Sequence, residues 1–338
     1  MYFRRILALL LLATSLAAQQ PAPARFRIVA PEKKENLADA MNRAATEHYR
    51  LVLLAGVALM ERTDSADAYE YALVEHGPDR AMRDGLNLYG ARGYKVVNGV
   101  RGRMFPTWDL LMEKAPGRPN QFQYVLESGH HIKMGTFLPR DDFTTFPGLV
   151  AERARAGYSV AAQAGIYTVL EKPAESLPDA APCTEPACYE LRVLDTRKHF
   201  ADKLTEAGRR RMRFASSAGW QGMSITEVLT LFLGDGQGTE YEYASVPMKY
   251  AKLIAPFQDA VAHGFCVRAR VEDVIVLERT APKRCEYRIL HGDAEVVTHD
   301  LEGAVADGFR PVLLSPEYHV GFSKVTPSYT IFAERTVP

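Results

Sequence analysis

The stretch CEYRILHGDAEVVTHDLEGAVADGFRP, residues 285–311, contains the pattern that predicts the fold. It opens with a tyrosine-centred run in which polar and apolar residues alternate, passes through a helical pattern, and stops at a glycine followed by an aromatic residue. Residues 240–267 and 69–97 follow the same order. Alternation is typical of a half-buried strand, and glycine suits the left-handed position just after a helix. The stretch therefore predicts a strand and a helix, and its recurrence predicts a repeat.

Two short strands are expected after each helix, the second ending in a signature such as LMEK or VLEK. The predicted unit is therefore β-α-β-β. A right-handed helical crossover makes the first two strands parallel, and the second and third strands form a hairpin. One such unit is a marginal core alone. We predict an α+β fold of about six tandem β-α-β-β units that form mixed sheet with amphipathic helices on one face.

The starts of the alternating runs set the expected boundaries of the units. The third unit carries an insertion at 129–145, which lengthens the connection between its first strand and its helix. The expected segments are a signal peptide at 1–18, repeats 1 to 6 at 26–64, 69–116, 121–175, 188–236, 240–282 and 285–327, and a terminal strand at 328–338.

A glycine near the end of each predicted helix is expected to take the left-handed C′ conformation, which costs a residue without a Cβ atom little. Repeat 1 has His48 at this place, so its helix is expected to end differently. The glycines assigned to this position are Gly93, Gly157, Gly208, Gly264 and Gly308.

The N-terminal sequence MYFRRILALLLLATSLAAQQ is typical of a secretory signal peptide. Arg4 and Arg5 form a basic region, a short apolar run follows, and small residues supply a cleavage site near Ala18. The apolar run is too short to span a bilayer, and no later stretch is suited to it. We expect a bacterial protein that is secreted or periplasmic, soluble, and without a transmembrane segment.

The formal net charge of the 338-residue chain is zero. Nucleic acid and anionic membranes usually select a basic surface, so neither is expected as a partner. The densest basic run, Arg209–Arg211 with Arg213, is interpreted as a solvated face of the protein.

Four cysteines allow three disulfide connectivities, and export makes disulfides permissible. Cys183 and Cys188 lie in a proline-containing loop that could close a small ring. Cys266 lies in a predicted strand, and Cys285 opens the first strand of the next unit. We favour the pairs Cys183–Cys188 and Cys266–Cys285 over a metal site, since neither pair has C-x-x-C spacing.

The insertion of repeat 3 holds the candidate metal ligands His130, His131, Asp141 and Asp142. Loops on a rigid scaffold often carry function, and histidine with carboxylate can bind a divalent metal or perform acid–base chemistry. Against this interpretation, adjacent histidines point in different directions, and Asp142 suits a helix N-cap. Phosphate-loop, H-E-x-x-H and G-x-S-x-G motifs are absent from the sequence, so no catalytic residue or cofactor is assigned.

A glutamate followed by arginine or lysine recurs after the last strand of several units. We interpret these charges as protection of exposed sheet edges, because a residue that recurs in every unit usually builds the unit. The pairs are Glu61/Arg62, Glu113/Lys114, Glu171/Lys172 and Glu278/Arg279.

The order of YEY, amphipathic helix, Gly-aromatic-x-V-V and a strand ending in LER or LEK resembles DUF4177, a small bacterial family of unknown function. The family's helix commonly ends in Gly-Trp, whereas this chain has Tyr94, Tyr158, Phe265 or Phe309 after the glycine, and the fourth unit has Arg209 there. The resemblance implies a tandem array of such units. It implies no catalytic residues, because the family has no established activity.

The first functional hypothesis is a non-catalytic exported repeat protein that serves as a scaffold or binding surface for a protein, peptide or envelope component. The alternative is a metal-binding protein or hydrolase-type enzyme with its site on the repeat 3 insertion. A third hypothesis is a small-molecule sensor with a pocket between repeats. The sequence leaves the partner and the oligomeric state open.

Overall fold

The computed structural model describes residues 23–32, 35–64, 69–101, 107–117, 121–128, 146–164, 167–174, 189–219, 227–234, 238–280, 283–320 and 325–337. Within these ranges the chain forms six helices and six three-stranded sheets, so the fold is α+β. Each sheet belongs to one β-α-β-β unit, and the units are numbered 1 to 6 in chain order.

The bounds of the elements are as follows. Units 1 to 3 are β1 (Phe26–Val29), α2 (Leu37–Thr46), β2 (Tyr49–Leu54), β3 (Ala58–Arg62); β4 (Glu70–Val74), α3 (Asp79–Gly90), β5 (Lys95–Arg101), β6 (Trp108–Lys114); and β7 (Phe122–Ser128), α4 (Phe146–Arg155), β8 (Ser159–Ala164), β9 (Tyr167–Pro173). Units 4 to 6 are β10 (Tyr189–Asp195), α5 (Phe200–Arg209), β11 (Met212–Gly219), β12 (Glu227–Gly234); β13 (Glu242–Pro247), α6 (Tyr250–Ala262), β14 (Cys266–Val271), β15 (Val274–Arg279); and β16 (Arg284–Gly292), α7 (Ala294–Ala306), β17 (Arg310–Val320), β18 (Val325–Val337).

The third strand of each unit lies between the first and the second, as in the order β1-β3-β2. The first and second strands run parallel to each other, as expected from the helical crossover. The prediction of mixed sheet is nevertheless wrong for the described strands, because each recorded pairing is antiparallel. The physical reason is that the hairpin returns the third strand into the space between the two parallel strands.

The last strand of the chain is part of unit 6. The sequence pattern predicts a separate terminal strand at 328–338 after the sixth unit. This prediction is wrong, because β18 is the central strand of the sixth sheet and pairs with both β16 and β17. The long hairpin formed by β17 and β18 hides this equivalence in the sequence, since its two strands are longer than those of the other units.

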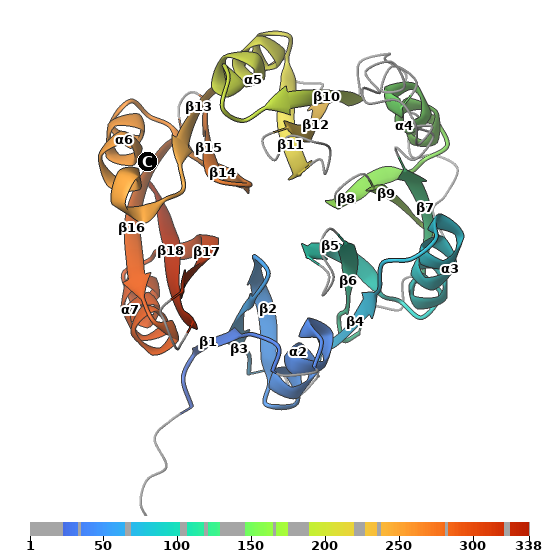
Figure 1. The fold of residues 1–338 in the computed structure, drawn as a ribbon, viewed down its shortest axis with the longest axis horizontal. Coiled ribbons are helices and arrows are strands. Elements are labelled where there is room, and N and C mark those ends of the chain that lie inside the picture. The colour runs from blue at the N-terminus through green and yellow to red at the C-terminus, as the bar shows by residue number, and fades with distance from the viewer. Residues whose placement is uncertain are drawn as a thin grey trace, which may run out of the picture.

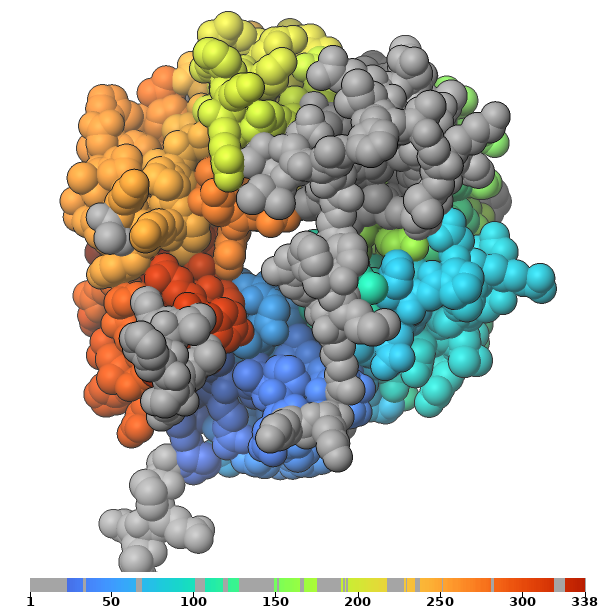
Figure 2. All heavy atoms as spheres, in the orientation of Figure 1, coloured from blue at the N-terminus to red at the C-terminus, as the bar shows by residue number. Residues whose placement is uncertain are grey.

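The six units are arranged as a ring, with unit 6 next to unit 1 (Figure 1). The helices lie on the outer rim, and the second strands point toward the centre. Viewed with all heavy atoms, the ring leaves an opening near its centre (Figure 2). The arrangement therefore resembles the radial packing of sheets in a β-propeller, with a helix on the outside of each sheet.

Each hydrophobic cluster extends across the contact between two consecutive units. Met82 and Leu86 of α3, for example, share a cluster with Tyr124 and Leu126 of the next unit. A corresponding cluster joins Phe26 of unit 1 to α7 of unit 6. Each contact between consecutive units, here called a seam, therefore contains part of the protein's core.

The central strand of each unit is buried on both faces. In β6, Leu110 and Met112 pack in the cluster shared with unit 3, whereas Leu111 packs in the cluster shared with unit 1. Alternate residues of a strand point to opposite faces of its sheet. The apolar run of the LxER signature is consequently explained by burial against two different neighbours.

The ends of the helices confirm most of the predicted glycine positions. Gly93, Gly157, Gly264 and Gly308 have φ values of 86°, 85°, 85° and 86°. His48 adopts the same left-handed conformation with φ 67°, so the helix of unit 1 ends as the others do. The assignment of Gly208 is wrong, because it lies inside α5 and the left-handed residue is Arg211, with φ 63°.

Close packing, and not the end of a helix, requires glycine at position 208. A Cβ atom at this position would lie 2.1 Å from the carbonyl oxygen of Tyr241, in the chain that leads into β13. Gly90 is similar, since its Cβ atom would lie 2.5 Å from the carbonyl oxygen of Phe122. In both cases the helix of one unit approaches the first strand of the next so closely that no side chain fits.

We predict that Gly208→Ala lowers the free energy of unfolding by about 1–3 kcal/mol, because α5 must move away from unit 5 to admit the methyl group. Gly303→Ala is the matched control, since a Cβ atom at Gly303 of α7 meets nothing within 4 Å. Removing a helical glycine there should raise the free energy of unfolding by about 0.5–1 kcal/mol. Urea unfolding of both variants tests the pair, and an equal response would contradict the role given to Gly208.

Candidate functional site

An equivalent hydrogen bond is present at four of the seams. It joins the second strand of one unit to the first strand of the next unit. In each sheet the register of the second strand shifts by one residue, which marks a β-bulge. The backbone N–H just before the bulge donates to the hydroxyl of a tyrosine in the next unit's first strand. The bonds are Leu51 N to Tyr71 Oη (2.8 Å), Val96 N to Tyr124 Oη (3.1 Å), Phe214 N to Tyr243 Oη (2.8 Å) and Val267 N to Tyr287 Oη (2.6 Å).

These hydroxyls also face the glutamate of the LxER signature in their own unit. Tyr243 Oη donates to Glu278 Oε2 at 3.1 Å, and Tyr287 Oη donates to Glu334. Burial, followed by the influence of the neighbouring carboxylate, raises the pKa of Tyr71, Tyr124 and Tyr287 above the ordinary value. Each hydroxyl therefore keeps its proton. Those of Tyr243 and Tyr287 accept from one unit and donate within the next, whereas Tyr124 Oη donates back to Tyr94 O of the preceding unit at 3.0 Å.

The position of these glutamates corrects the interpretation of the charged signature. Glu171, Glu278 and Glu334 are buried on central strands, not exposed at sheet edges. Each carboxylate has a cation beside it, Lys95 for Glu171, Arg213 for Glu278, and Arg310 with Lys283 for Glu334, which is why a charge can recur in the middle of the fold. The explanation by edge protection is wrong for Glu171 and Glu278, and Glu334 holds the equivalent position in unit 6.

A polar side chain from the preceding helix holds the backbone of the same tyrosine. Asn42 of α2 donates to Tyr71 O at 2.9 Å and accepts from Tyr71 N at 2.8 Å. Asn87 makes the same two bonds to Tyr124, and Thr205 makes the corresponding bonds to Tyr243. The open edge of each of these first strands is thereby closed by the helix of the unit before it.

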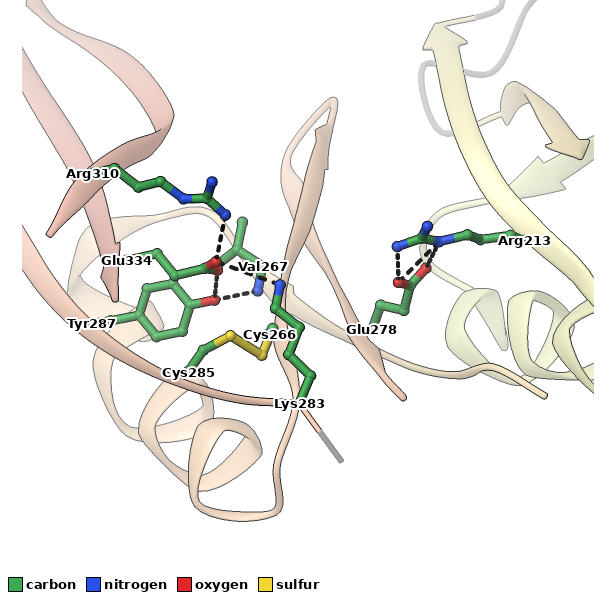
Figure 3. The surroundings of a disulfide bond; sticks show 9 residues. All are labelled: Arg213, Cys266, Val267, Glu278, Lys283, Cys285, Tyr287, Arg310 and Glu334. Carbon is green, nitrogen blue, oxygen red and sulfur yellow. Dashed lines mark hydrogen bonds and ion pairs between the residues drawn. A yellow bond between two sulfur atoms is a disulfide. The ribbon is translucent and has the colours of Figure 1, made fainter. Parts of the chain in front are cut away.

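At three of these four seams the residue that precedes the bulge N–H carries a second link across the seam; in unit 1 this residue is Arg50, which pairs with Glu61 of its own unit. Lys95 pairs with Glu171 of unit 3 at 3.0 Å, and Arg213 pairs with Glu278 of unit 5 at 2.7 Å. Between units 5 and 6, Cys266 occupies this position and forms a disulfide with Cys285, with a Cα–Cα distance of 5.6 Å (Figure 3). The favoured Cys266–Cys285 pairing is confirmed, and the disulfide takes the place of the ion pair.

With Cys266 in the place of a cation, Glu334 obtains its cations from within unit 6. Arg310 lies 3.4 Å from its Oε1 atom and Lys283 lies 3.5 Å from the same atom (Figure 3). The buried carboxylate thus remains compensated, as a buried charge must be.

We predict that Tyr243→Phe lowers the free energy of unfolding by about 1–3 kcal/mol, because the buried N–H of Phe214 loses its acceptor. Tyr318→Phe is the matched control, since the Tyr318 side chain is exposed. Equal urea midpoints for the two variants would show that the seam hydroxyl does not stabilise the ring.

We predict that Cys266→Ser, Cys285→Ser and the double variant each lose roughly 3 kcal/mol of unfolding free energy, the value expected for a loop closed by cysteines 19 residues apart. Equal losses in the three variants would assign the effect to the cross-link and not to side-chain packing. A double variant that unfolds at the wild-type urea concentration would refute the prediction.

The seam that closes the ring uses a different contact. Phe26 pairs with Glu61 in the register in which Tyr71 pairs with Glu113, so phenylalanine stands where other units have tyrosine. The residue before the bulge in unit 6 is Pro311, which has no N–H to donate. The hydroxyl and the N–H are both missing from this seam, while Glu302 of α7 accepts from Arg25 N at 2.5 Å.

Two surface hollows lie at the ends of sheets. The unit 1 hollow has a volume of about 910 Å³ and is lined by Pro23, Arg25, His48, Arg50 and residues 61–64. A second hollow of about 750 Å³ lies beside units 5 and 6, and Arg209, Glu242 and Lys283 are among its lining residues. Arg209 and Arg210 are exposed, and Arg210 pairs with Glu190 at 2.9 Å, which agrees with a solvated face for these two residues. Arg213 of the same basic run instead pairs with Glu278 at a seam.

The predicted metal ligands His130, His131, Asp141 and Asp142 lie outside the described residues, as do Cys183 and Cys188. Across the ranges that the structure describes, no group of three or more histidine, cysteine or acidic side chains is placed to hold a metal ion. Sequence reasoning missed the unit 1 hollow, because only the strand register shows that Arg25 stands where units 2, 5 and 6 carry glutamate.

Comparison with protein-family models, with curated proteins and with solved structures finds no match to this chain. None of the helices in the described ranges has the length and apolar character needed to cross a bilayer.

Proposed function

We propose that this protein is an exported, non-catalytic repeat protein that serves as a scaffold or binding surface for a protein, peptide or envelope component. In this proposal the six units are tandem copies of one β-α-β-β element, similar to DUF4177. The signal peptide is cleaved near Ala18, and the mature chain is secreted or periplasmic. The disulfide between Cys266 and Cys285 is consistent with an oxidising compartment.

The observation that carries the proposal is the use of the recurring polar residues at the seams. Four tyrosine hydroxyls, the glutamates Glu171 and Glu278, and polar side chains of three helices are bonded to neighbouring units. Residues of this kind build the ring. A frame that is built by shared residues leaves the residues that differ between units to form binding surfaces, as in other repeat proteins.

The alternative function places a metal site or a hydrolytic site on the insertion at 129–145, with His130, His131, Asp141 and Asp142 as ligands or acid–base groups. It is kept because the insertion is the part of the sequence in which histidine and carboxylate gather on a long connection.

Elemental analysis of the mature protein, purified from an export compartment without chelators, tests the two functions. The scaffold function predicts that the chain is folded and free of stoichiometric metal. It also predicts that a partner retained by the wild-type chain is retained by the His130→Ala/His131→Ala/Asp141→Ala/Asp142→Ala variant.

The matched control is Asp259→Ala/His263→Ala, which removes an exposed histidine–carboxylate pair on α6 whose atoms lie 3.6 Å apart. Stoichiometric metal that is lost in the quadruple variant but not in this control would overturn the scaffold function in favour of the alternative.

A further inference from the structure

The unit 1 hollow lies where the first strand of unit 1 begins and its third strand ends, beside the C-terminal end of α2. Arg25 enters it just before β1, Arg50 comes from β2, and Arg62 comes from the end of β3. His48, the first residue after the helix C-cap, lies at the same place. Three arginines from three different segments therefore line one depression.

Unit 1 departs here from an ion pair that is present in three other units. A glutamate in the first strand lies opposite a cation at the end of the third strand in units 2, 5 and 6. The pairs are Glu70–Lys114, Glu242–Arg279 and Glu286–Arg335. In unit 1 the corresponding residues are Arg25 and Arg62, which are joined by the bond from Arg62 N to Arg25 O at 2.8 Å. The position of the carboxylate is thus occupied by a second cation.

Glu61 fixes two of the three guanidinium groups. Its Oε1 atom accepts from Arg25 Nη2 at 2.8 Å and from Arg25 Nε at 3.1 Å, and its Oε2 atom accepts from Arg50 Nη2 at 3.3 Å. Only 18% of the Glu61 side chain is exposed, against about half of each arginine side chain. One carboxylate at the base of the hollow therefore orients two arginines whose outer N–H groups remain accessible.

Arg62 has no carboxylate that belongs to it within the described part of the chain. The Glu47 carboxylate accepts a hydrogen bond from Arg27 at 2.8 Å, which lowers the pKa of Glu47, and the charge of Arg62 only contributes to this lowering. The other acidic residue that lines the hollow is Asp64. Three arginines thus face two lining carboxylates, and the hollow carries a surplus of positive charge even with His48 neutral.

His48 adds a conformational departure at the same place. Units 2, 3, 5 and 6 have glycine here, which adopts a positive φ freely, whereas His48 holds φ 67°. Its carbonyl oxygen accepts from Thr63 N at 2.8 Å, which ties the helix end to the end of β3. The side chain of His48 therefore lines the hollow at a position where those four units have none.

We propose that the unit 1 hollow binds an oxyanion, carboxylate or phosphate, through Arg62 together with the outer N–H groups of Arg25 and Arg50. The planar guanidinium fork matches both kinds of oxyanion and forms bidentate hydrogen bonds with them. Glu61 supplies the fixed geometry, and the bound anion supplies the negative charge that the first-strand glutamate provides in units 2, 5 and 6. This inference goes beyond the scaffold function and does not depend on the identity of its partner.

Isothermal titration calorimetry of the full mature chain with inorganic phosphate, pyrophosphate and acetate tests the proposal. We expect saturable binding that weakens when the ionic strength is raised, since the contact is between charges at a surface. Tighter binding of phosphate or pyrophosphate than of acetate identifies a phosphate ligand, and the reverse order identifies a carboxylate ligand.

Arg62→Gln should weaken binding by about tenfold or more, the loss expected for one charge-assisted hydrogen bond. Arg25→Glu should weaken it at least as much while the protein stays folded, because it recreates the ion pair of units 2, 5 and 6. Arg279→Gln is the control, since this arginine holds the same position in unit 5 but is paired with Glu242.

The proposal is overturned if none of the three anions gives a saturable heat with the wild-type chain. It is also overturned if folded Arg25→Glu binds as the wild type does, or if Arg279→Gln loses as much affinity as Arg62→Gln. Urea unfolding of each variant separates a loss of binding from a loss of structure.

Discussion

The central strand of each unit is apolar on both faces, and the single helix of that unit covers only part of this surface. The remaining face must be covered by a neighbouring unit, because a three-stranded sheet with one helix is a marginal core alone. The clusters that join unit 1 to unit 2 and unit 6 to unit 1 show how this requirement is met at both sides of a unit. The ring follows from it, since an open array would leave an apolar face exposed at each end unless special residues capped it.

The same frame accepts several kinds of chemistry at its seams. A β-bulge presents an N–H to the next unit, and the tyrosine hydroxyl that accepts it is held near a buried glutamate. An ion pair reinforces the seam between units 4 and 5, and a disulfide reinforces the next one (Figure 3). Between units 3 and 4 the place of the glutamate is taken by Leu233, and the contact is largely apolar. The closing seam contains neither a tyrosine hydroxyl nor a bulge N–H.

The sequence patterns predict the individual helices and strands better than they predict which elements pack together in space. Alternation, helical periodicity and glycine C′ positions depend on residues close in sequence, so the α+β class and the left-handed Gly93, Gly157, Gly264 and Gly308 follow directly. Gly208 was misassigned because the reason for it, the carbonyl oxygen of Tyr241, lies more than thirty residues away. The signature glutamates were read as edge charges because their tyrosine partners are equally distant in sequence.

For the candidate sites, too, the sequence does not show which distant segments come together. The Cys266–Cys285 pair was predictable because both cysteines lie at the start of strands, β14 and β16, in consecutive units. The unit 1 hollow was not, since its cations come from three segments that a single sequence does not align. Only the strand register shows that Arg25 stands where Glu70, Glu242 and Glu286 stand in other units.

The closure of the ring has a consequence for assembly. Each sheet is built from consecutive strands of its own unit, so units 1 and 6 exchange no strand when they meet. Unit 1 and unit 6 contribute different surfaces to the contact between them, and the contact is therefore heterologous, or head-to-tail. If unit 6 of one molecule met unit 1 of the next, the cluster that contains Phe26 and Leu301 would form between molecules and build an open filament. The number of units in the chain, and the curvature that each contributes, keep that contact within a single molecule.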